Sequence, residues 1–164
     1  TYPLPEAQLD RFLFNLHVDY PSREEEIQIA TLNSSQSSDK LIPIFEKNRL
    51  ELLQKMVLEL PIAKHLVEWI VELVRATRPQ EKKSDKVQSF VEWGAGIRAS
   101  QNIVLASKAK ALLSGHHTVY MKDIQFVVPS ILRHRILLNF VGESEGWNSD
   151  QIIQQLLQQF EIKG

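Results

Sequence analysis

The chain has 164 residues, 43% of them hydrophobic, and its 19 lysines and arginines against 20 acidic residues leave a net charge of −1. This size allows one domain with a real core, or one domain plus a short extra segment, and the balanced charge excludes a whole-chain positive field that would attract nucleic acid or anionic membranes. Cysteine is absent and no apolar run approaches the roughly 18 residues of a bilayer span, so we expect a cytoplasmic protein without disulfides, thiolate metal sites or membrane insertion.

The first twenty residues combine a helix pattern with a strand pattern. Residues 6–13 follow Pro5, a favourable first-turn residue, and predict a short helix. Residues 14–18 alternate apolar and polar side chains, which predicts a strand, yet no second strand pattern follows to pair with it. It is either an edge strand or extended linker, or a strand whose sheet lies upstream of this chain. In the second case, the backbone of residues 1–20 would pair only with water or another chain.

The rest of the chain is predicted to be helical. Ser22 and Glu25 form a capping box for a helix that ends near Leu32. Apolar residues at helical spacing predict five further helices, over 45–60, 62–77, 97–113, 121–128 and 148–160. Polar or charged loops are predicted at 33–40 and 80–89, and Pro129 is expected to begin a new turn that runs to Arg135. The predicted fold is mainly α, a helical bundle preceded by a short helix and one orphan strand.

The sequence shows no self-sufficient catalytic site. It contains no GxxxxGK[ST] phosphate loop, no HExxH and no GxSxG. Of the five histidines only His116 and His117 are adjacent, and two neighbouring histidines without further ligands make a poor chelate, so we expect no metal site.

One candidate functional residue is Arg98, in "GAGIRAS". Gly94 and Gly96 interrupt regular structure just before a helix begins, and the first turn of a helix exposes unpaired N–H groups and partial positive charge. Loop glycines, a helix N-terminus and a guanidinium together suit a phosphate. The alternative is a surface ion pair between Arg98 and Glu92.

Three further sets of basic residues each allow more than one role. Arg11 could form a helix-surface ion pair with Glu6 or Asp10. The basic stretch 75–86 is best read as a solvated loop, and less well as a nucleic-acid contact. In "LRHRI" apolar residues enclose the cations on both sides, so an arginine there is expected to be half buried and paired with a carboxylate. The three tryptophans are expected in the core or at a domain contact; they are Trp69, Trp93 and Trp147.

Several stretches together resemble the MoxR family of AAA+ ATPases. They are "TYPLPEAQLDRF", "YPSREEE", "VRATR", "GAGIRAS" and "ILRHRI", in the family's order and spacing along nearly the whole chain. One departure is Ile97, where the family often has proline. The resemblance implies that residues 1–20 are the end of the AAA+ core, with the last core strand, and that 21–164 are the helical lid. Walker A, Walker B and sensor 1 would then lie outside this chain.

The resemblance also implies roles for two arginines. Arg11, in the "DRF" motif, would be an arginine finger that reaches in trans toward the γ-phosphate held by a neighbouring subunit. Arg98 would be the sensor 2 arginine of the lid, in contact with nucleotide phosphate; whether in its own subunit or a neighbour's stays open. An arginine suits both tasks because it is always charged and its planar fork matches phosphate oxygens.

For the parent protein the resemblance implies ATP and Mg²⁺ as cofactors and a homo-oligomeric ring, a hexamer. The ring would couple ATP hydrolysis to protein remodelling or to complex and cofactor maturation. Its partners would be a protein client and a von Willebrand factor A domain protein, with no nucleic acid. This chain alone is expected to be inactive and to hold no cofactor. The rival hypotheses are a helical nucleic-acid-binding module and a protein-interaction module without nucleotide.

Overall fold

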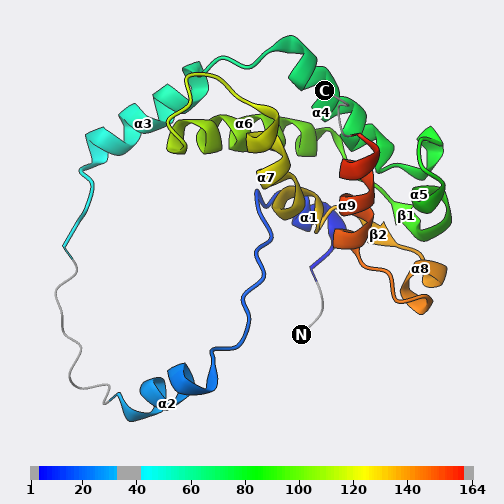
Figure 1. Ribbon diagram of the computed structural model, residues 1–164, viewed down its shortest axis with the longest axis horizontal. Helices are drawn as coiled ribbons and strands as arrows, with labels where there is room; N and C mark the ends of the chain where they lie inside the picture. The colour runs from blue at the N-terminus through cyan, green and yellow to red at the C-terminus, as the bar shows by residue number, and fades with distance from the viewer. Residues whose placement is uncertain (1–3, 33–41, 161–164) are drawn as a thin grey trace.

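The computed structural model describes residues 4–32 and 42–160; the predicted loop at 33–40 lies outside the described residues. The protein is mainly helical, as predicted (Figure 1). The chain begins with α1 (Glu6–Leu9) and α2 (Arg23–Thr31). The bundle follows, in the order α3 (Lys47–Glu59), α4 (Lys64–Ala76), α5 (Asp85–Phe90), α6 (Ile97–Leu113), α7 (Met121–Leu132), α8 (Phe140–Ser144) and α9 (Ser149–Gln159).

The core lies where α6 packs against α7, α4 and α3, and where α9 closes over α7 and α4. The predicted apolar stripe of α4 is buried, with Ile70, Leu73 and Val74 fully enclosed. The α9 stripe is buried at Ile152, Ile153 and Leu156, and Asn148 caps that helix by accepting from the Gln151 N–H. These helices bury their apolar faces against one another, which is the main source of helix stability in a protein.

The predicted helix that should have ended before Pro129 continues through it to Leu132, so that prediction was wrong. Proline lacks the N–H that would donate to the preceding turn. The helix persists because Val127, Val128 and Ile131 on the same segment are buried in the core. Packing outweighs the lost hydrogen bond here, and the residues of "LRHRI" consequently begin at a helix end rather than in a separate turn.

The predicted charged loop at 80–89 is also corrected. A short 3₁₀ helix, η1 (Pro79–Glu81), overlaps its start, and most of α5 lies within it; the Ser84 hydroxyl caps α5 by accepting from the Val87 N–H. Val87 and Phe90 are buried and hold this helix against the core. The many charged residues around them had suggested a loop.

A small antiparallel sheet, which the sequence did not predict, follows α5. It pairs β1 (Val91–Trp93) with β2 (Leu137–Leu138), Val91 opposite Leu138. Among the described residues these are the only strands. The alternating segment 14–18 is therefore not a strand here, because no sheet edge lies beside it. Its backbone nevertheless has a partner in this chain, contrary to expectation: the Asn15 N–H donates to Ser130 O at 2.8 Å.

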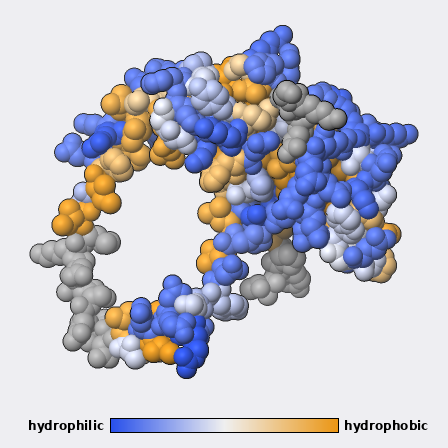
Figure 2. All heavy atoms as spheres, in the orientation of Figure 1, coloured by the Kyte–Doolittle hydropathy of each residue, from blue (hydrophilic) through white to orange (hydrophobic). Residues whose placement is uncertain are grey.

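Helix α2 stands apart from the helical body (Figure 1), and none of its residues is buried. Its capping box, formed by Ser22 and Glu25, is present as predicted. Hydrophobic side chains gather along the inner rim of the opening between α2 and the body (Figure 2). An apolar groove of about 590 Å³ lies between residues 13–14 and helices α3, α6 and α7, with Leu58, Leu105 and Phe126 among its lining residues. No helix of the described residues is long and apolar enough to cross a bilayer.

Candidate functional site

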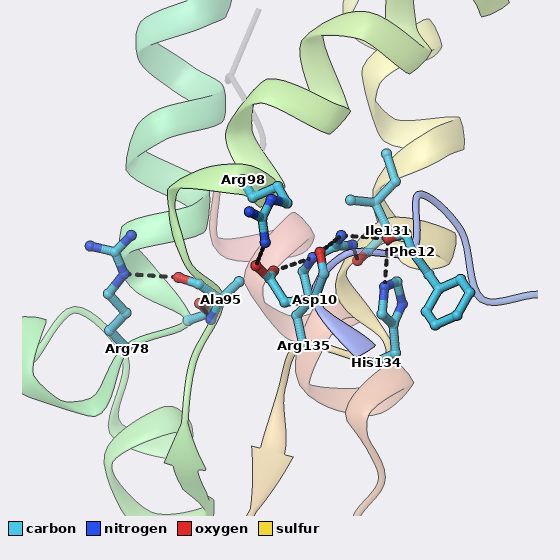
Figure 3. A network of polar contacts seen from close by, with 9 residues as sticks. Asp10, Phe12, Arg78, Ala95, Arg98, Ile131, His134 and Arg135 are labelled. Carbon is cyan, nitrogen blue, oxygen red and sulfur yellow. Dashed lines mark hydrogen bonds and ion pairs between the residues drawn. The ribbon is translucent and has the colours of Figure 1, made fainter. Parts of the chain in front are cut away.

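The glycine-containing loop before α6 is fixed to the end of α4. The Ala95 N–H donates to Thr77 Oγ1 at 2.9 Å, and Arg78 Nε donates to Ala95 O at 3.0 Å (Figure 3). Gly94 packs directly on the Thr77 backbone, where a Cβ atom would lie 2.3 Å from the carbonyl oxygen. This close approach explains the first glycine, and it sets where the helix that carries Arg98 begins.

Gly94→Ala is expected to destabilise the protein by about 1–3 kcal/mol, the usual cost of forcing extra volume into a packed site. Gly96→Ala is the matched control: nothing lies within 4 Å of its added Cβ, and its φ of −80° suits any residue. We expect the control to cost less, at most about 1 kcal/mol, because Gly96 is the N-cap of α6, where alanine is a poorer residue than glycine. Urea unfolding of both variants measures the difference, and equal midpoints would contradict the role assigned to Gly94.

Arg98 is the second residue of α6, and its side chain turns toward Asp10. Arg98 NH1 lies 2.8 Å from Asp10 Oδ2, and the two side chains are 48% and 30% exposed. The expected alternative partner, Glu92, makes no such pair. The first turn of α6 has no acidic residue, so Asp10 is the anion that faces this positively polarised helix end.

The same carboxylate binds a second arginine. Arg135 Nε donates to Asp10 Oδ1 at 2.9 Å, and the Arg135 side chain is only 1% exposed (Figure 3). Its remaining donors reach the carbonyl oxygens of Asp10, Phe12 and Ile131. An arginine of "LRHRI" was predicted to be half buried and paired with a carboxylate; the pairing is confirmed, and the burial is more complete than predicted. The buried guanidinium ties the N-terminal segment to the end of α7.

Arg11 directly follows this anchored aspartate. Its side chain is exposed, and its N–H donates to Gln8 O at 3.1 Å. The suggested ion pair with Asp10 is not formed, because both Asp10 oxygens face other arginines; the alternative partner, the Glu6 side chain, lies outside the described residues. Within the part of the chain that the structure describes, no hydrogen bond or ion pair involves the Arg11 guanidinium.

His134 adds a neutral contact to the same segment. Its Nε2 lies 3.1 Å from Phe12 O, so the neutral ring donates there, whereas Nδ1 is buried without a partner. Burial, followed by the positive charge of Arg135, lowers the pKa of His134 below its ordinary value of 6.5. A proton on Nδ1 would place a buried charge between two arginines.

The stability of the protein is therefore expected to fall as the pH drops below 6.5. Below that value the unfolded chain protonates His134 while the folded chain resists, so unfolding takes up protons and becomes easier. His134→Gln should flatten this part of the pH dependence, whereas the exposed His65→Gln should not. Urea unfolding above and below pH 6.5 tests it; parallel curves for His134→Gln and the unsubstituted protein would refute it.

A cavity of about 510 Å³ joins these parts. Its lining includes Asp10, the loop glycines Gly94 and Gly96, and residues 133–137. Trp93 also lines it and is 63% exposed, so of the two expected places, the core and a domain contact, only the domain contact stays a prediction for this tryptophan. Trp69 and Trp147 are partly buried against the core, as expected.

Comparison with known proteins assigns the chain to a family. Residues 83–156 match the AAA lid domain. The chain is 36% identical to the chaperone MoxR1 of Mycobacterium tuberculosis over 96% of its own length and 42% of the relative's, and 35% identical to the uncharacterised protein YeaC of Bacillus subtilis over 96% and 47%. A crystal structure from Cytophaga hutchinsonii, of a protein assigned as an ATPase, superposes with a TM-score of 0.81 at 34% identity, covering 96% of this chain and 48% of the other.

The chain belongs to the MoxR family of AAA+ ATPases. It spans about half the length of the curated relatives it matches. The match to the AAA lid domain includes Arg98 and Arg135, whereas Arg11 and Asp10 precede it. The site therefore joins the MoxR lid to the segment before it.

The basic stretch 75–86 of this MoxR-family chain is committed to internal contacts. Arg75 pairs with Glu81 at 2.9 Å, and Lys83 pairs with Glu72. Lys86 lies over the Phe90 and Trp147 rings. The stretch is thus partly helical, with these three cations in internal contacts, although Arg75, Lys82 and Lys86 remain exposed to solvent.

One of the two adjacent histidines contacts a carboxylate. His116 Nδ1 lies 3.0 Å from the buried carboxylate of Asp123, and among the described residues no group of three or more potential ligands could hold a metal ion. This His–Asp contact ties the start of α7 to the preceding turn.

Asp10 is the site residue that sequence reasoning missed, since it was considered only as a partner for Arg11. It meets Arg98 across 88 residues and Arg135 across 125, and no local spacing rule reports contacts at that separation. The available signal was the presence of two arginine motifs in the family resemblance, each of which needs an anion.

Proposed function

We propose that this chain supplies the lid and two phosphate-directed arginines to an ATP-hydrolysing MoxR-type ring. Arg98 contacts nucleotide phosphate from the lid, and Arg11 reaches in trans to the γ-phosphate held by a neighbouring subunit. Residues 1–20 belong to the end of the AAA+ core, and residues 21–164 form the lid. The proposed compartment is the cytoplasm.

One observation carries the proposal: the Arg98 guanidinium lies 2.8 Å from the carboxylate of Asp10, the residue next to Arg11. The lid arginine thus contacts the segment that carries the finger candidate, although the two arginines are 87 positions apart in the sequence. An arginine that already binds a carboxylate in a partly exposed setting has the geometry to bind a phosphate. Arg11, whose side chain is exposed, is free to act outside its own chain.

The residues of this chain fit part of a nucleotide site. Arg98 and Arg11 offer cations to phosphate oxygens, but the sequence has no phosphate loop and the described residues hold no carboxylate cluster for Mg²⁺. Bound Mg²⁺–ATP would supply the phosphoryl group, and this chain would contribute charge around it. The remaining ligands belong to the core, in the longer protein.

The oligomeric part of the proposal follows from the trans role of Arg11. A finger that serves a neighbouring site requires a closed head-to-tail assembly, for which we propose a homo-hexamer. Its ATP hydrolysis would remodel a protein client or mature a complex or cofactor, beside a von Willebrand factor A domain partner. The M. tuberculosis relative named a chaperone supports this direction.

In the longer protein, Arg98→Ala is expected to lower ATP turnover and also to weaken nucleotide affinity, because this arginine sits on the lid. The expected loss for one phosphate-directed, charge-assisted contact is about tenfold to a hundredfold. Arg75→Ala, which removes a guanidinium from the surface pair with Glu81, is the control and should change neither quantity. Steady-state phosphate release and calorimetric ADP binding give the two readouts; equal behaviour of the two variants would sink the assignment.

The 164-residue chain alone tests whether the phosphate-binding part of the ATP site lies outside it. Without a phosphate loop it should release no phosphate from ATP above the buffer background. Sustained release by the purified chain would show that it contains a complete site, and the proposal would have to be abandoned.

A further inference from the structure

The two arginines on Asp10 are held unequally. Arg135 is almost fully buried and donates to Asp10 Oδ1 and to three carbonyl oxygens. Breaking these contacts would leave its buried positive charge without a partner, so Arg135 stays bound to Asp10. Arg98 is about half exposed, and among the described residues its guanidinium pairs with Asp10 Oδ2 alone. Of the two partners, Arg98 is therefore the exchangeable one.

A carboxylate and a phosphate use the same donors of a guanidinium. Both accept parallel N–H bonds from its planar fork, so an Arg98 that binds phosphate must give up part or all of its contact with Asp10. Asp10 cannot follow Arg98, because Arg135 holds its other oxygen and its backbone carbonyl. The two anions thus compete for one cation.

We propose that Asp10 is the resting partner of Arg98, a carboxylate that nucleotide phosphate displaces when it binds. This inference rests on the proposed function, since it assigns a positioning residue to the same site. The exchange has two consequences. Asp10 lowers nucleotide affinity because it competes with phosphate for Arg98, and the lid arginine is linked to the residue that directly precedes Arg11.

The test is the nucleotide affinity of Asp10→Asn in the longer protein. Asparagine keeps an oxygen for Arg135 but removes the charge that competes for Arg98, so ADP should bind about two- to fivefold more tightly, the range carried by a partly exposed ion pair. The gain must depend on Arg98, so Asp10→Asn should give no gain in an Arg98→Ala background.

Asp150→Asn is the matched control. Asp150 also pairs with an arginine of "LRHRI", since both its oxygens lie 2.9 Å from Arg133 Nε, yet it makes no contact with Arg98. Its neutralisation should leave ADP affinity unchanged. If Asp10 had only a structural role, Asp10→Asn would lower thermal stability without tightening ADP binding, and its ADP affinity would equal that of Asp150→Asn.

The outcomes separate the two proposals. If the unsubstituted protein binds no nucleotide, the proposed function fails and the exchange fails with it. If it binds ADP but a folded Asp10→Asn binds equally or more weakly, only the exchange is overturned. If Asp10→Asn does not fold, the carboxylate resonance of Asp10 in the unsubstituted protein decides: ADP should shift it because Arg98 leaves Oδ2, and an unshifted resonance in the ADP complex would overturn the inference.

Discussion

Arg11→Ala in the longer protein is expected to lower ATP turnover about 10³–10⁵-fold, the range measured for arginine fingers. Nucleotide affinity should change little, because a finger stabilises the charge that develops in the transition state more than the bound ground state. Folding should be unaffected, since the Arg11 side chain is exposed and Arg135 anchors the segment through Asp10 and Phe12 instead.

The trans role is tested by mixing subunits. Arg11→Ala rings are combined with rings whose own phosphate loop is disabled, and activity should partly recover because one intact interface forms from the two defective subunits. Arg23→Ala, at the start of the distant helix α2, is a suitable control for the removal of an exposed arginine. If the mixed rings assemble but do not recover ATP hydrolysis, Arg11 does not act in trans and is an ordinary surface residue.

Arg135→Ala is expected to destabilise the protein by about 3–5 kcal/mol, the usual cost of breaking a buried ion pair. The change removes the cation that satisfies Asp10 and three carbonyl oxygens, and it opens a void at the end of α7. It should also release residues 10–12 from α7, so their amides should exchange faster.

Arg75→Ala provides the comparison, because that arginine is 47% exposed and pairs with Glu81 at the surface. A surface pair of this kind is worth at most about 1 kcal/mol. Urea unfolding should therefore separate the two variants clearly. If they unfold at the same urea concentration, the buried network around Arg135 does not hold the N-terminal segment in the way described.

The sequence predicted those parts of the fold that local rules govern. The apolar stripes of α4 and α9 repeat at helical spacing and are buried as expected, and the Ser22 capping box forms. Pro129 and α5 were misjudged because tertiary burial outweighed a local rule at each place. The β1–β2 pair could not be foreseen, because it joins two very short segments whose pairing depends on α6 and α7 between them.

Sequence reasoning singled out the arginines of the candidate site but not the aspartate that joins them. Arg98 and the buried arginine of "LRHRI" stand in motifs whose neighbours reveal them: glycines in one case, enclosing apolar residues in the other. Asp10 stands in an ordinary charged stretch, and its importance arises only when the fold brings α6 and the end of α7 to the same carboxylate. Long-range charge pairing of this kind has no periodicity to detect.

Helix α2 has nine residues and no buried side chain, so its formation adds nothing to the core that α4, α6, α7 and α9 enclose. A helix of this length is marginal in water on its own, and its capping box offsets only part of that deficit. Mutations in α2 can therefore accumulate without a penalty to the folding of the bundle. Even its apolar Ile27 and Ile29 are about half exposed, so polar residues at these two positions would leave the packing of the bundle core intact.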